Sequence, residues 1–141
     1  MLKVKFHEDY EDQLLKYAVI VSQYGDYWVF CKHKQRNTYE CPGGHRKPGE
    51  DILTTAEREL FEETGAISYT VREICPYSVT DTEQNVQTYG MLYFADIIRF
   101  SEMPDSEMER IVVTETLPEK WADPLIQPKL VEKVCSVVGA S

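Results

Sequence analysis

Three glutamates and an arginine within six residues are the strongest candidates for chemistry in this sequence. Glu59 precedes Glu62 by three residues and Glu63 by four, so on a helix the three carboxylates lie on one side. Like charges at this spacing repel, and the helix dipole disfavours anions near the C-terminal end. Hard carboxylate oxygens gathered in this way are the ligands that Mg²⁺ or Mn²⁺ prefers. A solvated acidic face with an Arg58–Glu62 ion pair is the alternative, and the glutamates alone do not decide between the two.

The loop before this helix combines turn residues with basic side chains. Residues 42–44 (Pro-Gly-Gly) and 48–49 (Pro-Gly) favour sharp turns and allow the backbone to approach a ligand closely. Between them lie Arg46 and Lys47, two cations in a chain whose formal charge is −9. We therefore expect Arg46, Lys47 and Gly44 to contribute to binding a phosphorylated ligand.

Residues 44–66 resemble the Nudix box, the motif of the Nudix hydrolase family. The motif is written G-x5-E-x7-R-E-U-x-E-E-x-G-U, where U is a bulky aliphatic residue. Eight positions of the chain fall on it, namely Gly44, Glu50, Arg58, Glu59, Leu60, Glu62, Glu63 and Gly65. The departure is Ala66 at the final U, and we expect Ile67 to fill its packing role. So many fixed positions in about a sixth of the chain make a specific signal.

The resemblance implies a fold, a cofactor and roles for these residues. The fold would be α/β, an α/β/α sandwich with a mixed central β-sheet, in one domain over residues 1–141. The cofactor would be Mg²⁺ (or Mn²⁺), held by ligands from the helix and the loop, namely Glu59, Glu62, Glu63 and the Gly43 carbonyl. Arg58 is expected to orient the glutamates, principally Glu62, while Glu50 either holds the loop or lies in an outer shell with a smaller effect.

A general base is also required, and here the resemblance leaves alternatives. In MutT-like members a loop glutamate precedes the last strand and a Leu-Pro pair. Glu107 stands at a comparable spacing from the Leu-Pro pair at residues 117–118. Other members take the base from the helix, and Glu102 and Glu109 are neighbouring candidates. A solvated acidic loop explains Glu107 equally well.

The resemblance implies hydrolysis of the pyrophosphate linkage of a nucleoside diphosphate derivative. The short chain and its flanking sequences look most like MutT-type (d)NTP pyrophosphatases, some of which act on oxidised guanine nucleotides. Trimming of an RNA 5′ end is a related alternative; ADP-ribose and dinucleoside polyphosphates are less favoured. From a different class, a non-catalytic module that binds nucleotides or proteins remains an alternative, although such modules usually lack one of the box glutamates or the arginine, all of which are present here.

The elements that position the box follow from its pattern and its flanks. An apolar stripe through Leu53, Ala56, Leu60 and Phe61 predicts an amphipathic helix, which Gly65 ends. Apolar and alternating runs predict strands at residues 2–6, 17–22, 27–32, 38–41, 67–80, 86–100 and 111–117, and a last helix at 129–138. A bend or bulge is expected at Pro76. For Tyr24, Tyr27 and Trp28, sheet packing is favoured over the lining of a base pocket.

Composition restricts the partners and the compartment. The charge of −9 argues against a stable nucleic-acid partner or an anionic membrane, but not against a small nucleotide whose charge metal ions neutralise. The four cysteines lack metal-site spacing, so reduced thiols in a cytoplasmic protein are the simplest interpretation. Cys41 is expected to be a small buried hydrophobe rather than a catalytic thiol. Many members of the resembled family dimerise, so a homodimer is left open.

Overall fold

A long antiparallel hairpin forms the two longest strands of the sheet. The computed structural model describes residues 1–102 and 108–139, without the side chains of residues 108–110. The hairpin pairs β6 (Ala66–Asp81) with β7 (Val86–Phe100), and β1 (Leu2–Phe6) adds to the free edge of β6. The register of the hairpin shifts between Glu73 and Cys75, next to Pro76, where a bulge was expected.

The other edge of β7 carries β2 (Leu15–Tyr24), which runs parallel to it and follows a short 3₁₀ turn (Asp12–Leu14). The second half of β2 pairs with β3 (Tyr27–His33), and its first half pairs with β5 (Gly43–His45). Further antiparallel partners of β3 are β4 (Tyr39–Glu40) and β8 (Met108–Thr114). The short strand β5 therefore lies beside the middle of the sheet, where the box loop begins.

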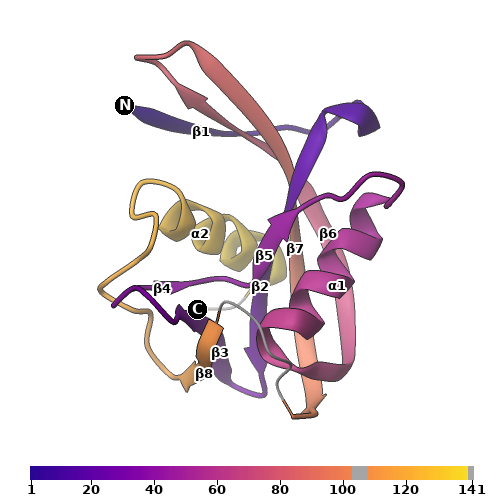
Figure 1. Cartoon of the computed structure of the whole chain (residues 1–141), viewed down its shortest axis with the longest axis vertical. Helices are drawn as coiled ribbons and strands as arrows, with labels where there is room; N and C mark the ends of the chain where they lie inside the picture. The colour runs from indigo at the N-terminus through magenta and orange to yellow at the C-terminus, as the bar shows by residue number, and fades with distance from the viewer. Residues whose placement is uncertain (103–107, 140–141) are drawn as a thin grey trace.

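Two helices cover opposite faces of this mixed sheet (Figure 1). Helix α1 (Ile52–Thr64) packs on one face and α2 (Gln127–Val138) on the other. Along β7 the alternation of side chains sends Met91 and Tyr93 toward α1 and Leu92 toward α2. The predicted α/β/α sandwich with a mixed sheet is confirmed. No helix among the described residues is long and apolar enough to cross a membrane.

The box helix has a capped start at Asp51 and ends at Gly65, as the sequence predicts for its C-terminal end. The Asp51 side chain accepts a hydrogen bond from the Thr54 N–H at 2.8 Å and caps the first turn. Gly65 adopts the left-handed conformation with φ of 79°, and its N–H donates to the Phe61 carbonyl. These caps fix where α1 starts and stops, and therefore which way its glutamates face.

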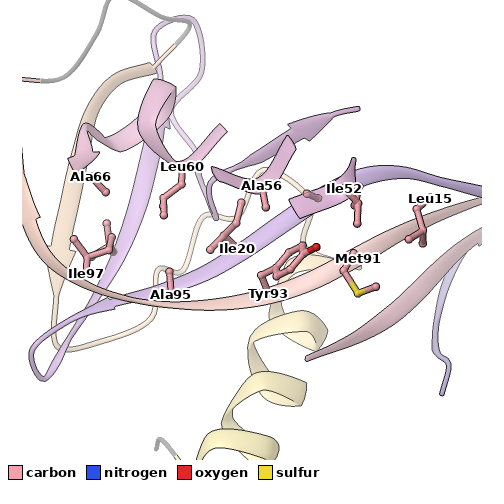
Figure 2. Close-up of a cluster of buried hydrophobic side chains, with 12 residues drawn as sticks. Leu15, Ile20, Ile52, Ala56, Leu60, Ala66, Met91, Tyr93, Ala95 and Ile97 are labelled. Atoms are coloured by element: carbon pink, nitrogen blue, oxygen red, sulfur yellow. The ribbon is translucent and has the colours of Figure 1, made fainter. Parts of the chain in front are cut away.

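The buried face of α1 differs from the predicted stripe. Ile52, Ala56 and Leu60 point into the core beside Tyr93 and Ile97, as Figure 2 shows. Leu53 and Phe61 were wrongly placed in this stripe, since they are 42% and 41% exposed. Ile52, Ala56 and Leu60 are spaced by four residues and therefore lie along one line of the helix. This line packs against the sheet.

The expectation for Ile67 was also wrong. Ala66 is only 1% exposed and belongs to the core cluster, whereas Ile67 is 45% exposed. Alternation along β6 places neighbouring side chains on opposite faces, so Ile67 does not replace Ala66.

The observed boundaries of α2 (Gln127–Val138) and β8 (Met108–Thr114) differ from the predicted ones by a few residues. Helix α2 begins at Gln127 rather than at residue 129, with Pro128 in its first turn, where a missing N–H costs nothing. Strand β8 starts at Met108 and ends at Thr114, earlier than the predicted range of 111–117.

The difference between Leu53 and Leu60 can be measured. Leu60 is fully buried, so Leu60→Ala is expected to lower the free energy of unfolding by about 2–5 kcal/mol. Leu53→Ala removes the same atoms from an exposed site of the same helix and should change it by about 0.5 kcal/mol or less. Urea unfolding of both variants checks this, and equal losses would contradict the packing described here.

Candidate active site

Arg58 is the centre of a network that joins the box helix to its loop. Its guanidinium binds Glu50 through two nitrogens, with Nε–Oε2 and Nη2–Oε1 distances of 2.6 and 3.0 Å. Nη1 donates to Glu59 at 2.7 Å, and Nη2 also donates to the His45 carbonyl at 3.0 Å. The contacts with Glu62 are longer, at 3.4 Å. The expectation that Arg58 mainly orients Glu62 was therefore wrong, because Glu50 and Glu59 take its shorter bonds.

Glu50 holds the loop, as expected from the box. Its Oε1 accepts hydrogen bonds from the Lys47 N–H and the Thr55 hydroxyl, each at 2.9 Å. The hydrogen bond from Arg58, followed by the bond from the Lys47 N–H, lowers the pKa of Glu50 to about 2. The ionised carboxylate thus connects the loop, the first turn of α1 and the arginine.

This pKa predicts how stability depends on pH. The folded-state pKa of Glu50 lies below the unfolded value of about 4.3, so ionised Glu50 stabilises the fold above that pH. The contribution is lost as the pH falls toward about 2. We expect Glu50→Gln to be less stable than the wild type at neutral pH, with the difference shrinking over this acid range. Denaturant unfolding at a series of pH values measures it, and a constant difference would contradict the assignment.

Glu59 lies against the backbone of the loop. A Cβ built on Gly44 would collide with the Glu59 carboxylate, so glycine at this position allows the close approach. Burial raises the pKa of Glu59, while the hydrogen bond from Arg58 opposes the shift, and Lys47 also attracts this carboxylate. A carboxylate held in this way is a suitable cation ligand, because a bound cation would offset the cost of its burial.

Glu63 points from the last turn of α1 to the start of β5. Its side chain is buried, and its Oε1 accepts a hydrogen bond from the Gly43 N–H at 2.9 Å. Glu62 is more exposed, with 42% of its side-chain surface accessible. In the described part of the chain, no three acidic, histidine or cysteine side chains already surround one point as metal ligands would. Hydrogen bonds to Arg58 and to Gly43 occupy Glu59 and Glu63 instead.

The strand register directs the Gly43 carbonyl to the same side. The hydrogen bonds from Ile20 N–H to Pro42 and from Arg46 N–H to Lys16 place the bonded pairs of β2 and β5 two residues apart. Gly43 therefore lies opposite Val19 in a non-bonded pair, with its N–H and C=O directed away from β2. Three carboxylates and this carbonyl are oxygen donors of the kind that Mg²⁺ prefers, so the donor set fits the expected cofactor.

The two loop cations differ in position. Arg46 binds the Asp12 carboxylate at 2.9 Å, and it also donates to the Glu50 carbonyl at 2.8 Å. Its guanidinium thereby ties the loop to the segment before β2. Lys47 is exposed and lies close enough to Glu59 to affect its pKa. Of the two, Lys47 is the more exposed.

Two of the three candidate bases after β7 have side chains outside the described residues. Glu107 lies outside the described residues, and the side chain of Glu109 does too. Glu102 is described and exposed, and its carbonyl accepts a bond from the Ser101 hydroxyl. Cys41 is buried, as expected, and burial raises the pKa of its thiol far above the ordinary range, which opposes a nucleophilic role.

A cleft of about 440 Å³ opens on the other side of β5. Sequence reasoning missed most of its lining, which includes Tyr17, His45, Tyr77, Tyr89, Asp123 and Gln127. Tyr24, Tyr27 and Trp28 do not line it: Trp28 is buried in the core and the two tyrosines lie at the exposed end of the β2–β3 hairpin. Residues from five separate segments meet here, and no spacing in the sequence signals that they do.

Comparison with known proteins identifies relatives. The model of the NUDIX domain family matches residues 15–128. A Bacillus subtilis (strain 168) protein, YtkD, described as an 8-oxo-dGTP diphosphatase, is 32% identical over 105 residues, which are 74% of this chain. The match covers 65% of YtkD, so the chain spans less than two thirds of that relative.

Solved structures show the same fold at lower identity. The Bacillus subtilis pyrophosphohydrolase BsRppH superposes with a TM-score of 0.78 at 24% identity, over 99% of this chain and 93% of its own. The NUDIX domain of Shewanella oneidensis NrtR, solved with ADP ribose, gives 0.65 at 15% identity over 92% and 94% of the two chains. The ligands and reactions of such relatives are varied.

Proposed function

This chain belongs to the NUDIX domain family, and from that premise we propose that it hydrolyses the pyrophosphate linkage of a nucleoside triphosphate with the help of Mg²⁺. The observation that carries the proposal is the Arg58 network, which binds Glu50 and Glu59, with Glu59 against Gly44, while Glu63 accepts a hydrogen bond from the Gly43 N–H. All charged positions of the box are present, and Arg58, Glu59 and Glu63 contact the loop. We propose residues 1–141 as one domain that carries the whole site.

The substrate poses an electrostatic problem that these residues can solve. A triphosphate is a polyanion that repels an attacking water. Divalent ions bound here would neutralise that charge, polarise the phosphoryl oxygens and lower the pKa of water. In the proposal Glu59, Glu62, Glu63 and the Gly43 carbonyl are the ligands. A carboxylate has two oxygens, so Glu59 can keep the hydrogen bond from Arg58 on one oxygen while the other holds the ion.

The remaining residues bind or position. Arg58 keeps the glutamates oriented and compensates part of their mutual repulsion. Lys47 attracts the phosphates, and Gly44 leaves room for Glu59. Glu107 is proposed to accept the proton from the attacking water, on the strength of its spacing from the Leu-Pro pair at 117–118.

The finer choice of substrate rests on sequence similarity. The relative YtkD supports a MutT-like (d)NTP pyrophosphatase, with oxidised guanine nucleotides among its substrates. A cytoplasmic location and a homodimer stay predictions.

A hydrolysis screen with product identification tests the proposal. The protein is incubated with canonical and oxidised (d)NTPs, ADP-ribose, dinucleoside polyphosphates and 5′-triphosphorylated RNA, with Mg²⁺ and with Mg²⁺ removed by a chelator. We expect (d)NTPs to yield monophosphate and pyrophosphate only with the metal. Turnover of another class alone would overturn the substrate assignment. If none of the substrates is hydrolysed while nucleotide binding is retained, the result would favour the non-catalytic module.

A further inference from the structure

The turn that leads into the box has few backbone donors to hold it in place. Cys41, Pro42 and Gly43 connect β4 with β5, and Pro42 has no N–H, so only Cys41 and Gly43 can donate from the main chain. The Gly43 N–H donates to Glu63 at 2.9 Å, and the Pro42 carbonyl accepts from the Ile20 N–H at 2.9 Å. The Cys41 N–H is therefore the remaining donor that can fix where this turn lies.

The Cys41 N–H is bound by a side chain from a distant part of the sequence. It donates to Oε1 of Gln127 at 2.6 Å, a short distance for an N–H···O bond. Cys41 is 3% exposed and Gln127 is 8% exposed, so both groups are shielded from water. Loss of this acceptor would leave a buried N–H with little access to water, which is costly for the local structure.

Gln127 takes over where the main-chain partner of this edge ends. The Tyr39 N–H donates to the Lys120 carbonyl at 2.8 Å, and the Ala122 N–H donates to the Tyr39 carbonyl at 2.9 Å. In an extended segment the N–H groups of residues two apart point to the same edge, so the Cys41 N–H faces the same edge as that of Tyr39. The side chain of Gln127 therefore continues the pairing after the backbone has turned toward α2.

The position of Gln127 is itself fixed by α2. Gln127 is the first residue of that helix, and its N–H donates to the Asp123 carbonyl at 3.0 Å. Leu130, Val131 and Val134 of the same helix are buried in the core cluster on this face of the sheet. Helix α2 is thus a rigid support for the acceptor, on the face of the sheet opposite α1.

The turn that Gln127 holds carries one group of the proposed metal site and contacts another. Gly43 supplies the carbonyl, and its N–H binds Glu63. A Cβ on Gly43 would collide with the Ala18 carbonyl, so the turn also packs closely against β2. A shift of the turn would therefore move the Gly43 carbonyl relative to Glu63.

We propose that Gln127 is a positioning residue for the metal site, which accepts the Cys41 N–H and thereby holds the Gly43 carbonyl in one ligand set with Glu63. The inference rests on the proposed function, because it takes this carbonyl and Glu63 as ligands. It gives a role to α2, which contributes no residue to the box. Replacement of a residue that orients metal ligands typically costs about tenfold to a hundredfold in metal affinity.

Two substitutions separate the hydrogen bond from the packing of Gln127. Gln127→Leu keeps a side chain of similar size and removes the acceptor, whereas Gln127→Glu keeps an acceptor oxygen whether its carboxyl group is ionised or protonated. Gln84→Leu is the matched control, because Gln84 is exposed in the turn between β6 and β7. Thermal unfolding verifies that each variant is folded.

Metal affinity is the first readout. The protein is titrated with Mn²⁺ without nucleotide, and electron paramagnetic resonance measures the free ion, so contacts of Gln127 with a substrate do not contribute. We expect Gln127→Leu to bind Mn²⁺ about tenfold more weakly than the wild type, or weaker still. Gln127→Glu and Gln84→Leu should stay within about threefold of the wild type, because the first keeps the acceptor and the second lies far along the chain from the turn.

Amide hydrogen exchange followed by NMR is the second readout. In the wild type the N–H groups of Cys41 and Gly43 should both be protected. In Gln127→Leu both should exchange about tenfold faster or more, while the amides that pair β6 with β7 keep their rates. If Gln127→Leu does not fold, the wild type decides: rapid exchange of the Cys41 N–H contradicts the anchoring role, and protection shared with Gly43 supports it.

The outcomes distinguish the inference from the proposed function. Unchanged Mn²⁺ affinity in folded Gln127→Leu, or equal losses in Gln127→Leu and Gln127→Glu, would overturn the positioning role. Mn²⁺ binding that depends on Gln127, in a protein that hydrolyses no nucleotide, would overturn only the proposed function. A wild type that binds no Mn²⁺ would overturn both.

Discussion

Glu63→Gln is expected to reduce turnover by about a hundredfold to a thousandfold without unfolding the protein. The substitution removes one charge from the proposed ligand set and keeps the shape of the side chain. Its amide oxygen can still accept the hydrogen bond from the Gly43 N–H, which the carboxylate accepts at 2.9 Å. Steady-state kinetics at saturating Mg²⁺ measure the loss, and thermal unfolding verifies the fold.

Glu57→Gln is the matched control for this experiment. Glu57 lies on the same helix, but it is exposed and accepts a hydrogen bond from the Tyr69 hydroxyl at 3.1 Å. The Glu57→Gln substitution makes the same change of charge as Glu63→Gln, but away from the loop. Its turnover should therefore stay near that of the wild type. A Glu63→Gln enzyme as active as this control would remove Glu63 from the ligand set.

Arg58→Lys is expected to lower turnover about tenfold to a hundredfold and to raise the Mg²⁺ concentration needed for half-maximal rate. All three guanidinium nitrogens are used, by Glu50, Glu59 and the His45 carbonyl. Lysine keeps the positive charge but cannot hold these acceptors in one planar arrangement. In this variant the lysine ammonium would still offset the charge of the glutamates, but it would not fix their orientation.

The magnesium dependence distinguishes positioning from bulk charge. If Arg58 acted only by reducing repulsion, lysine would restore both the rate and the metal requirement. A normal rate and metal requirement for Arg58→Lys would therefore contradict the positioning role. Arg46→Lys is a suitable comparison, because Arg46 binds Asp12 and backbone carbonyls outside the proposed ligand set. Its effect should appear in stability more than in the metal requirement.

Local patterns were enough for most elements of the fold. The strand at residues 86–100 was predicted with the bounds of β7, and Gly65 was correctly identified as the end of α1. These features depend on neighbouring residues, through side-chain alternation and the left-handed conformation of a glycine. The errors at Leu53, Phe61 and Ile67 have a different origin. Which apolar residues are buried depends on the surface they meet, and a helical stripe drawn from sequence can be rotated by one position.

Some contacts within the box follow from local spacing, and others depend on the tertiary structure. Its spacing places Arg58 and the three glutamates on one helix, because a helix brings residues three and four apart together. The choice of Glu50 as the main partner of Arg58 requires the loop to fold back over the first turn of α1. A pairing over eight positions is not dictated by helical geometry, so the closer Glu62 was preferred in error.

The sequence by itself determined the family, the class of fold and the box residues of the proposed catalytic centre, because the box is one continuous segment with fixed short-range spacing. Only the tertiary structure decided how Arg58 divides its hydrogen bonds, which face of α1 is buried, and which residues form the cleft. Tyr17, His45, Tyr77, Asp123 and Gln127 meet because β2, β5, β6 and the start of α2 converge. Contacts between distant segments depend on strand order and packing, which no local pattern encodes.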